Sequence, residues 1–434
     1  MVQAYARDQA AWAPSGTPAA VVRARMLGDV VATVEEMRGL RTPVVPRGAG
    51  SGLSGGANAV EGSVVLSLAS MDRIVDVDVA DQLAVVQPGV VNGALKRAAA
   101  EAGLWYAPDP ASSEFCTVGG NVATNAGGLC CTKYGSTREH VLALQVVTGT
   151  GEVLTFGHRS PRSAVGYDLT GLLVGSEGTL GVVTEVTLRL RPPPPPPATT
   201  AAFFSSAAAA GEAVALIARS GVDPSVLEMM DRTTLTAVES WKRLDLDLDA
   251  AALVLVQTDD RGSGRAEAAA VVERCCSEAG ATYAVSTTDP DEGEMFLQAR
   301  KLALPALERL GTAVVDDVGV PRSRLGVLID HVAAVSRRHG VTIGCFGHAG
   351  VGVLHPTIVL SGETAAEPAR AAFDDVVTAA LRLGGTITGE HGVGNLKTSF
   401  LREEVDEGAA RVHLAIKRAF DPDGILNPGK AIGA

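Results

Sequence analysis

The sequence predicts an α+β protein built from two main domains, and three observations support that expectation. The chain has 434 residues, which is too many for one small core, and 46% of them are apolar, as in folded globular proteins. Stretches with the spacing of helices and of strands recur along the whole length. Six consecutive prolines at 192–197 fit neither a helix nor a central strand, so they indicate a stiff linker between two domains.

The first domain, residues 1–191, is expected to combine short strands and helices with glycine-rich loops. The chain from 18 to 40 has the pattern of a strand followed by a helix, with Asp29 in the first turn of that helix. Further along, the pattern predicts strands at 43–46, 64–68, 74–79 and 83–87 and a helix at 92–102.

The second domain, residues 198–399, alternates helices and strands in a way that is typical of an antiparallel sheet backed by helices. The expected helices cover 207–219, 265–279, 323–339 and 364–383, and the expected strands cover 226–230, 252–258, 312–318, 341–347 and 353–360. The tail, residues 400–434, holds one helix at 409–420 and a turn-rich run at 421–430. Such a tail has little core of its own, so we expect it to dock on the rest of the molecule.

The charge balance and the apolar pattern exclude several classes of protein. The chain has 37 Lys and Arg against 49 Asp and Glu, a net charge of −12, and no long basic run, so nucleic acid is not an expected partner. It has no stretch of 18 apolar residues, and its N-terminus lacks the apolar core of a signal peptide. The six cysteines lack the spacing of a zinc or redox site and are expected to be reduced thiols of a cytoplasmic protein. Peripheral association with a membrane stays open.

A glycine-rich loop follows the strand expected at 43–46. Gly50, Gly52 and Gly55 have the spacing of a Rossmann dinucleotide loop, which requires a helix directly after the third glycine. The chain instead enters the strand at 64–68, which argues against a Rossmann fold. Successive small residues still expose backbone N–H groups that can bind a phosphate, although an ordinary surface loop would have the same composition.

Two further glycine-dense segments lie in the same domain, at 112–135 and 174–185. Backbone without bulky side chains allows close approach of a ligand. Three such segments within one domain indicate a long ligand that lies against the backbone, and a dinucleotide has that size.

Two short histidine-containing segments stand out in the second domain. His348 and His355 are separated by two glycines, which allow the chain to reverse and bring the imidazoles together, and Glu390 and His391 are flanked by glycines as well. Two imidazoles and one carboxylate suit zinc, manganese or another divalent ion, with a substrate hydroxyl and carboxylate in the open positions. Hairpins in which these side chains pair locally explain the same pattern equally well.

The complete set of motifs resembles a known family. Residues 46–56, 117–128, 133–135 and 175–181 carry the motifs of the FAD-binding domain of the vanillyl-alcohol oxidase and p-cresol methylhydroxylase superfamily. Essentially the whole chain is similar to the branch with D-lactate dehydrogenases, D-2-hydroxyglutarate dehydrogenases and the FAD subunit of glycolate oxidase. The resemblance implies a two-subdomain FAD-binding domain at 1–191, an α+β cap domain with an antiparallel sheet at 198–399, and a tail at 400–434 that returns to the FAD domain.

By this resemblance the glycine segments hold FAD. The loop at 47–56 would hold the pyrophosphate, the segment at 117–128 would lie along the flavin and ribityl chain, the residues around 177–183 would hold the adenosine end, and the tail would reach the isoalloxazine edge. The implied cofactor-binding residues are Pro46, Arg47, Gly48, Ala49, Gly50, Ser51, Gly52, Ser54, Gly55, Pro110, Thr117, Gly119, Gly120, Thr124, Asn125, Gly127, Gly128, Glu177, Gly178, Gly181, Val183 and Asn427. Some members attach FAD through a histidine or cysteine. The pyrophosphate loop has neither and the offset of Cys116 does not match, so non-covalent FAD is expected.

The metal-dependent members of the family carry an H-x-G-D-G-N-L-H segment and a G-E-H-G segment. This chain keeps both histidines and the G-E-H-G, but Val351 and Val353 stand where aspartate and asparagine are common, which removes polar groups that orient ligands. The implied metal ligands are His348, His355 and Glu390. His391 would be the general base, because an imidazole accepts a proton near neutral pH.

Arg300 resembles the family arginine that pairs with the substrate α-carboxylate, for which a guanidinium is well suited. The hydroxyglutarate enzymes also carry a threonine and a lysine for a distal carboxylate, and Leu304 and Val315 occupy those places here. The resemblance therefore implies oxidation of a small or aliphatic D-2-hydroxy acid, such as lactate or glycolate, by hydride transfer to flavin N5. Lys397 also fits the family pattern, and its role is left open.

Reoxidation of the flavin requires an acceptor, for which a quinone, an electron-transfer flavoprotein or an iron–sulfur subunit are the candidates. The oligomeric state is open, with a homodimer as one option. Three other functions compete: a flavin-binding subunit without activity of its own, a reductase of the cell-wall precursor type, and an ether-lipid synthase. The synthases carry a run of histidines, and this sequence has none.

Overall fold

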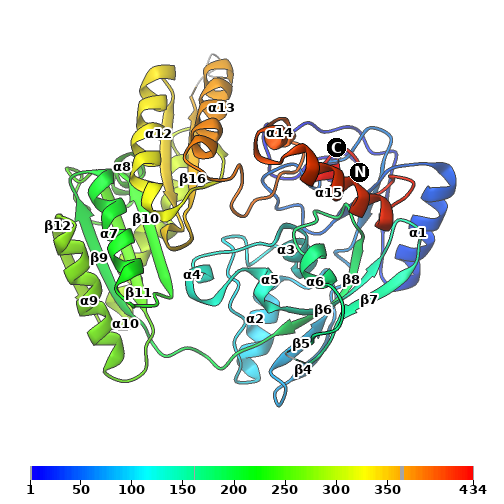
Figure 1. Cartoon of the computed structure of the whole chain (residues 1–434), viewed down its shortest axis with the longest axis horizontal. Helices are drawn as coiled ribbons and strands as arrows, with labels where there is room; N and C mark the ends of the chain where they lie inside the picture. The colour runs from blue at the N-terminus through cyan, green and yellow to red at the C-terminus, as the bar shows by residue number, and fades with distance from the viewer. Residues whose placement is uncertain (1, 161, 362–365, 434) are drawn as a thin grey trace. The chain divides into compact units, whose positions relative to one another are not determined.

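The computed structural model describes residues 2–160, 162–361 and 366–433. The chain forms two compact units, shown by the colour sequence in Figure 1. The first unit consists of the described residues of Met1–Gly128, Gly135–Pro193 and Glu390–Ala434, and the second consists of those of Leu129–Tyr134 and Pro194–Gly389. This division differs from the sequence-based boundaries at three places. Residues 129–134 belong to the second unit, residues 390–399 belong to the first, and the polyproline run is divided between Pro193 and Pro194.

The first unit contains a small parallel sheet in the order β1-β3-β2, formed by β1 (Ala20–Arg23), β2 (Val44–Arg47) and β3 (Val64–Ser67). Helix α1 (Leu27–Leu40) connects β1 to β2 and buries Val30 and Val34 against this sheet. The C-terminal tail extends the sheet, because the N–H of Val44 donates to the carbonyl of Ile425 and Val44 bridges to Leu426. Two segments from opposite ends of the chain therefore share one core.

An antiparallel sheet in the order β4-β5-β8-β6-β7 forms the rest of the first unit. Its strands are β4 (Ile74–Asp78), β5 (Leu83–Val86), β6 (Val141–Val147), β7 (Val153–Gly157) and β8 (Val182–Arg189). The helices of this part are α2 (Asn92–Glu101), α3 (Val118–Thr124), α5 (Thr137–His140) and α6 (Leu169–Leu173). Residues of α2, α3 and α6 pack against the sheet in one continuous apolar core, which holds α3 in place.

The tail of the first unit contains α14 (Leu401–Glu404) and α15 (Glu407–Phe420). Lys417, buried on α15, donates to the carbonyls of Thr179 and Leu426 and to the carboxylate of Asp421. Burial lowers the pKa of Lys417, although its hydrogen bond to Asp421 opposes that shift. These contacts fix the tail beside the loop that precedes β8.

The second unit contains a larger sheet in the order β12-β9-β11-β10-β15-β16-β13, with β14 paired to β16, and every pairing in it is antiparallel. Its strands are β9 (Ala198–Phe204), β10 (Val226–Asp231), β11 (Ala252–Thr258), β12 (Ala281–Thr287), β13 (Thr312–Val315), β14 (Val318–Gly319), β15 (Thr342–Gly347) and β16 (Val353–Leu360). The antiparallel sheet expected from the sequence is confirmed. Strands β9 and β12 were not among the expected elements.

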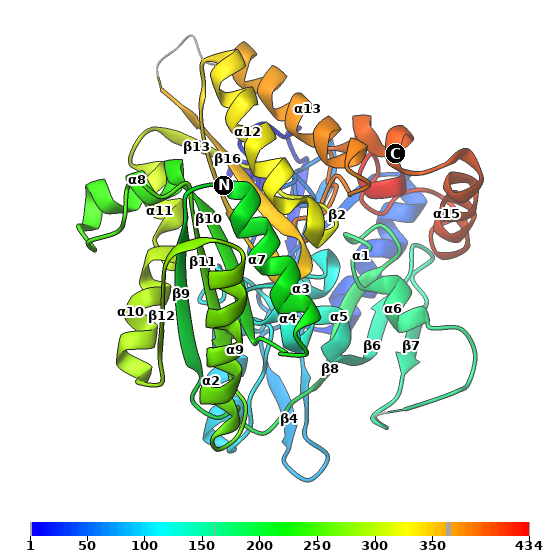
Figure 2. The ribbon, with the colours of Figure 1, turned by 60° about the vertical axis from the view of Figure 1, so that its left-hand side comes forward.

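Helices cover both faces of this sheet. One layer, in front of the sheet in Figure 2, consists of α7 (Ala207–Arg219), α9 (Gly264–Glu278), α12 (Leu325–His339) and α13 (Ala366–Arg382). The other consists of α8 (Arg232–Lys242), α10 (Pro290–Lys301) and α11 (Ala303–Glu308), which pack on the apolar core of the opposite face. The expected helix at 364–383 begins with two residues that lie outside the described chain. Helices α8, α10 and α11 were not predicted, and α10 carries Arg300.

One short segment of the second unit comes from the glycine-rich part of the sequence. Helix α4 (Cys131–Tyr134) lies against the large sheet, where Lys133 Nζ donates to Asp259 Oδ1 over 2.7 Å and the Tyr134 hydroxyl donates to the other carboxylate oxygen. The segment at 129–134 is therefore tied to the cap sheet by charged side chains.

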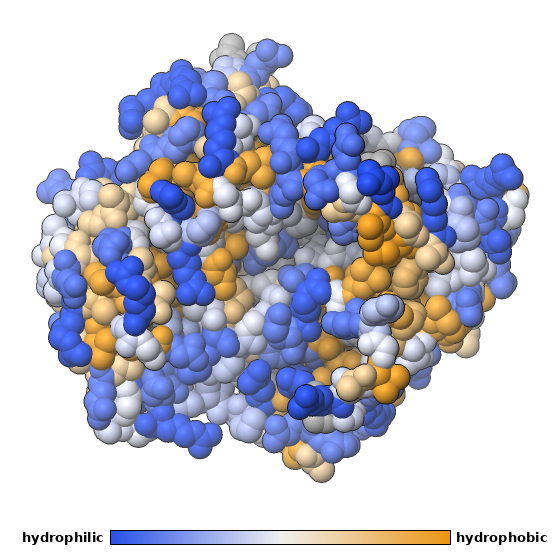
Figure 3. All heavy atoms as spheres, viewed as in Figure 1, coloured by the Kyte–Doolittle hydropathy of each residue, from blue (hydrophilic) through white to orange (hydrophobic). Residues whose placement is uncertain are grey.

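Within the described residues, no helix combines the length and the apolar character needed to cross a membrane. The face drawn in Figure 3 carries hydrophilic side chains over most of its area, with smaller apolar areas among them.

Candidate active site

The three glycine-rich segments of the first unit meet around helix α3. A Cβ added to Gly48 would lie 2.2 Å from Oγ1 of Thr117, which caps the start of α3, so the loop after β2 runs directly against this helix end. The backbone N–H groups of Gly175 and Glu177 donate to the carbonyls of Val122 and Ala123 near the end of the same helix. The segments predicted to hold one long ligand are therefore neighbours in space.

Residues of the tail complete this arrangement. Asn427 donates from Nδ2 to the carbonyls of Gly56 and Glu177, over 2.9 and 2.7 Å, and links the first and third segments. Its Oδ1 is buried and accepts no hydrogen bond from a described residue. A buried acceptor of this kind would be satisfied by a donor on a bound ligand. The surroundings of Asn427 are therefore compatible with the contact to the isoalloxazine edge that the family resemblance implies.

Several glycines in these segments cannot be replaced without strain. Gly128 has a φ of +134°, and a Cβ there would lie 2.4 Å from the carbonyl oxygen of Asp109. Gly50 and Gly55 also have positive φ values. Main-chain segments therefore pack closely against each other in the region where the cofactor is expected. Glycine allows this close approach because it has no side chain.

The remaining predicted cofactor residues occupy the same region of the first unit. Pro46 and Arg47 end β2, and Ala49, Ser51, Gly52 and Ser54 form the loop after it. Gly119, Gly120 and Thr124 belong to α3, Asn125 is its C-cap, and Gly127 follows. Pro110 lies in the preceding loop, Gly178 and Gly181 lie just before β8, and Val183 belongs to β8.

Glu177 has a second role that the sequence did not indicate. Its carboxylate accepts hydrogen bonds of 2.8 Å each from the N–H groups of Val393 and Gly394. Burial raises the pKa of Glu177 to about 7, although these hydrogen bonds and the charge of Lys430 oppose the shift. Its backbone N–H donates to a carbonyl of helix α3 and its carbonyl accepts from Asn427, so the side chain and the backbone of Glu177 both have partners within the first unit.

Two more buried charges lie beside the pyrophosphate loop and were missed by the sequence. Lys430 donates to the carbonyls of Gly56 and Asn58, and burial lowers its pKa to about 8 despite the nearby charges of Asp8 and Glu177. Burial likewise raises the pKa of Asp8 and lowers that of Arg47. The grouping of these charges could not be predicted from the sequence, because Asp8, Arg47 and Lys430 lie far apart along the chain.

In the second unit, the hairpin of β15 and β16 brings two histidines together. Phe346 pairs with His355 across the strands, and His348 lies in the turn that follows β15. The two imidazoles meet edge to face, with ring centroids 5.2 Å apart, and both side chains are buried. The chain reversal expected at the glycines between them is present.

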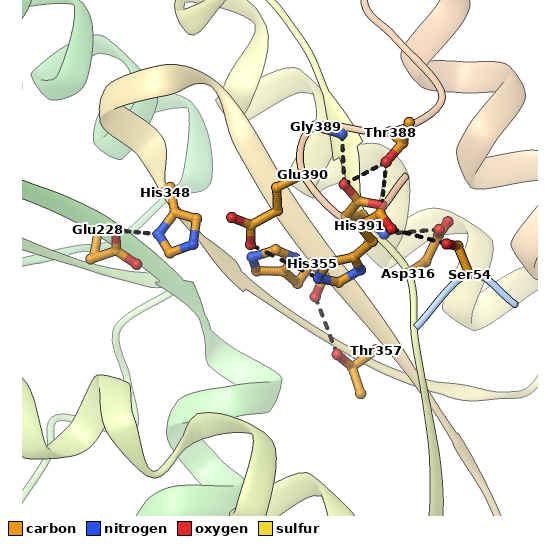
Figure 4. A network of polar contacts seen from close by, with 11 residues as sticks. Ser54, Glu228, Asp316, His348, His355, Thr357, Thr388, Gly389, Glu390 and His391 are labelled. Atoms are coloured by element: carbon orange, nitrogen blue, oxygen red, sulfur yellow. Dashed lines mark hydrogen bonds and ion pairs between the residues drawn. The ribbon is translucent and has the colours of Figure 1, made fainter. Parts of the chain in front are cut away.

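Glu390 directly follows Gly389, the last residue of the second unit, and shares this site. Ligand atoms of His348, His355 and Glu390 all lie within 4.8 Å of one another, and Figure 4 shows the carboxylate of Glu390 beside the two rings. Two imidazoles and one carboxylate are a suitable ligand set for a divalent metal, and this set leaves positions open for a substrate.

The position of Glu390 is set by the residues before it. Asp317, fully buried, accepts from the N–H of Gly389 over 2.6 Å and from the hydroxyl of Thr388 over 3.0 Å. A Cβ on Gly389 would lie 2.4 Å from a methyl group of Val353. Val353, which replaces the asparagine common in the family, therefore packs against this turn, and Asp317 supplies a polar anchor there.

A buried chain of polar contacts joins His348 to Arg300. Glu228 accepts from Nδ1 of His348 over 2.8 Å and from Nε of Arg300 over 2.6 Å. Burial alone would raise the pKa of Glu228, but its interactions with His348 and Arg300 more than offset this and lower it. The guanidinium also lies over the ring of Phe346, 4.7 Å from its centroid. Glu228 therefore contacts both Arg300 and His348, and it links Arg300 to the predicted metal site.

His391 lies next to the predicted ligand Glu390. Its Nε2 is 3.9 Å from Glu390 Oε1, and its backbone carbonyl accepts from the Ser54 hydroxyl over 2.9 Å. The His391 side chain is 14% exposed. A mostly shielded imidazole at this place has the chemistry of a general base.

Comparison with known proteins identifies the family. The model described as "FAD linked oxidases, C-terminal domain" matches residues 194–431, and the model described as "FAD binding domain" matches residues 18–157. The chain belongs to the FAD-linked oxidase family. Both models describe FAD-linked proteins, so FAD is the cofactor of this chain.

Individual relatives of this FAD-linked oxidase agree with that assignment. The chain is 36% identical to glycolate oxidase subunit GlcD of Bacillus subtilis over 416 residues, covering 95% of this chain and 88% of the relative. It is 32% identical to a D-lactate dehydrogenase of Anaerostipes hadrus over 440 residues, covering 98% and 92%. Its fold is similar to that of 4-ethylphenol oxidase from Gulosibacter chungangensis, with a TM-score of 0.80, 19% identity and coverage of 99% and 92%. The predicted fold class is confirmed.

Proposed function

We propose that this FAD-linked oxidase converts a small or aliphatic D-2-hydroxy acid, of the lactate or glycolate kind, to the 2-oxo acid. The observation that carries the proposal is the cluster of His348, His355 and Glu390, with Arg300 joined to it through Glu228. The names of the relatives support the same substrate class. FAD, when bound, supplies the acceptor for the hydride from C2 of the substrate.

Each residue of the site has a defined task in this proposal. Arg300 binds the substrate carboxylate with its two terminal nitrogens, which form no hydrogen bond with a described residue. His348, His355 and Glu390 hold a divalent ion, zinc or manganese, which would polarise the C2 hydroxyl. His391 takes the hydroxyl proton as the C2 hydride leaves, so the substrate loses two electrons and two hydrogens and becomes the 2-oxo acid.

Apolar residues at the two positions where the hydroxyglutarate enzymes carry polar ones favour a substrate with a single carboxylate. Leu304 packs against the apolar core of the second unit, and Val315 ends β13. Neither side chain can pair with a second carboxylate. A buried charge without a partner is costly, so a dicarboxylate would bind poorly at these positions.

A dye-reduction assay tests this function. Purified protein with FAD is mixed with D- and L-2-hydroxy acids, including lactate, glycolate, 2-hydroxybutyrate and 2-hydroxyglutarate, before and after treatment with EDTA. We expect bleaching of the dye with D-lactate or glycolate and weak activity with 2-hydroxyglutarate. Elemental analysis identifies a tightly held ion. No turnover with any of these acids would refute the proposal.

A flavin-binding subunit without activity of its own is the second candidate, because the Bacillus subtilis relative is named a subunit. The same assay distinguishes the two, since such a subunit would not reduce dye alone. A partner that accepts electrons, an iron–sulfur subunit, a flavoprotein or a quinone, fits either case. We also propose that FAD is not covalently bound, so acid precipitation should release it into the supernatant.

A further inference from the structure

We infer that Glu228 is a positioning residue that holds the metal ligand His348 and the substrate-binding Arg300 in one fixed arrangement. The inference rests on the proposed function, because both partners have their roles there. Glu228 has no exposed surface, and each of its two carboxylate oxygens is used by a different partner. One side chain thus connects the two halves of the site.

The bond to His348 determines which imidazole nitrogen is left for a metal. Oε1 of Glu228 lies 2.8 Å from Nδ1 of His348, and a carboxylate in this position accepts the proton of Nδ1. The lone pair of His348 then lies on Nε2, the nitrogen that can coordinate. A carboxylate behind a histidine ligand fixes both the tautomer and the ring orientation.

The bond to Arg300 fixes the plane of the guanidinium. Glu228 uses only Nε, and the ring of Phe346 lies against the same guanidinium. The two terminal nitrogens are therefore held in a set direction. Two parallel hydrogen bonds from these nitrogens match the geometry of a carboxylate.

The backbone of Glu228 is held in place by the sheet, because its strand pairs with a neighbour on each side. Strand β10 pairs with β11 along its whole length and with β15 next to the turn that carries His348. The alternation of the strand points Glu228 toward the face that packs on α10, where Arg300 lies in the last helical turn. The carboxylate is therefore carried by a strand that is paired on both sides.

The substitution Glu228→Gln tests the inference with little change in volume. An amide can accept one of the two hydrogen bonds but presents an N–H₂ group to the other partner. We expect the affinity for Mn²⁺ or Co²⁺, titrated into metal-free protein that retains FAD, to fall by about 10- to 100-fold. The KM for the hydroxy acid should rise roughly tenfold, since a hydrogen bond to a charged group is lost or misdirected.

Asp231→Asn is the matched control. Asp231 is a buried carboxylate on the same strand, but it caps helix α8 by accepting from Thr234. Its substitution should leave the metal affinity and the KM unchanged. If Glu228→Gln loses FAD or native circular dichroism, Glu228→Asp replaces it, because a shorter carboxylate keeps the charge yet cannot reach both partners.

The two measurements separate the possible outcomes. Wild-type metal affinity and KM in a folded Glu228 variant would overturn the inference. Equal losses in the Asp231 variant would also overturn it, since they would show a general effect of buried carboxylates. Failure of the wild-type protein to bind either ion would overturn the metal part as well. The dye-reduction assay would still decide the proposed function separately.

Discussion

The two units of this FAD-linked oxidase build their sites from different materials. In the first unit the proposed cofactor site is largely backbone, with glycines such as Gly128 at places where a side chain would not fit. In the second unit the predicted site residues, such as His348 and Arg300, are polar or charged side chains, and buried carboxylates such as Glu228 and Asp317 hold this region. Backbone suits a cofactor that is held in one position throughout the reaction. Charged groups suit a site where a proton and charge must move.

The first prediction concerns the proposed general base, His391, and has the largest expected effect. His391→Ala removes the proposed base, so turnover should fall by about 100- to 10,000-fold. Because the backbone carbonyl of His391, which holds Ser54, is retained, the FAD content should stay at the wild-type level. Steady-state kinetics and the flavin absorbance measure the two effects.

The control for this variant is His413→Ala, which removes an exposed histidine of α15. Its turnover should match the wild type. Full activity of the His391 variant would show that the reaction does not need this imidazole as a base.

The second prediction concerns the backbone of the cradle. Gly128→Ala places a Cβ 2.4 Å from the carbonyl oxygen of Asp109 and requires a φ of +134°, which L-residues rarely adopt. The expected cost is about 3 kcal/mol of unfolding free energy, with loss of bound FAD. Denaturant unfolding and the ratio of flavin to protein absorbance test this.

Gly221→Ala is the control for this substitution. Gly221 has a φ of +84°, but nothing lies within 4 Å of the added Cβ. The cost should be only about 1 kcal/mol, and FAD should be retained. Similar losses in both variants would mean that positive φ alone, rather than close packing, makes glycine necessary.

The third prediction concerns the anchor of Glu390. Asp317→Asn replaces a carboxylate that accepts from both Gly389 and Thr388 by an amide with a single acceptor oxygen. We expect a loss of about 1–3 kcal/mol, divided between stability and kcat/KM, with FAD content unchanged. Thermal unfolding and kinetics measure the two parts.

Asp375→Asn serves as its control, because Asp375 is a partly exposed partner of Arg338 and His339 on the same unit. Exposed ion pairs contribute little, so less than about 1 kcal/mol should be lost and kcat/KM should be unaffected. An unaffected Asp317 variant would indicate that Val353 alone holds the turn.

The contrast between the units also explains what could be predicted from the sequence. Glycine spacing indicates backbone geometry directly, so segments such as 46–56 and 117–128 could be predicted to lie against a ligand, and the structure places them beside helix α3. Histidines and glycines near each other in the sequence likewise indicated the hairpin of His348 and His355. Glu228 and Asp317 were missed, because each acts through a partner that is distant in the sequence. A glutamate inside the apolar strand Val226–Asp231 was the one available sign of a buried carboxylate.

The same limit applies to the charges beside the FAD loop. Lys430, Asp8 and Glu177 come together only when the tail and the N-terminal segment have folded onto the first unit. No spacing along the chain relates them. A pattern of local motifs therefore predicts where a ligand lies, but not which buried charges surround it.

The last prediction uses Glu177, a charged side chain within the first unit, and concerns the dependence of stability on pH. Its pKa is about 7 in the folded protein, above the usual 4.5, because burial disfavours the ionised form. The folded state therefore holds a proton that the unfolded chain has released, and stability should fall as the pH rises from about 4.5 to 7. The contribution is at most about 1.4 kcal/mol per pH unit.

Glu177→Gln removes this titration but also weakens the hydrogen bonds from Val393 and Gly394. We expect a variant that is less stable at pH 5 and that approaches the wild type as the pH rises to 7, measured by denaturant unfolding at each pH. The lowered pKa of Lys430, about 8, acts in a different range: its contribution is lost as the pH falls from about 10.5 through 8. A constant difference between the two proteins from pH 5 to 7 would show that Glu177 is ionised throughout, and that even the backbone-built unit tolerates a buried charge.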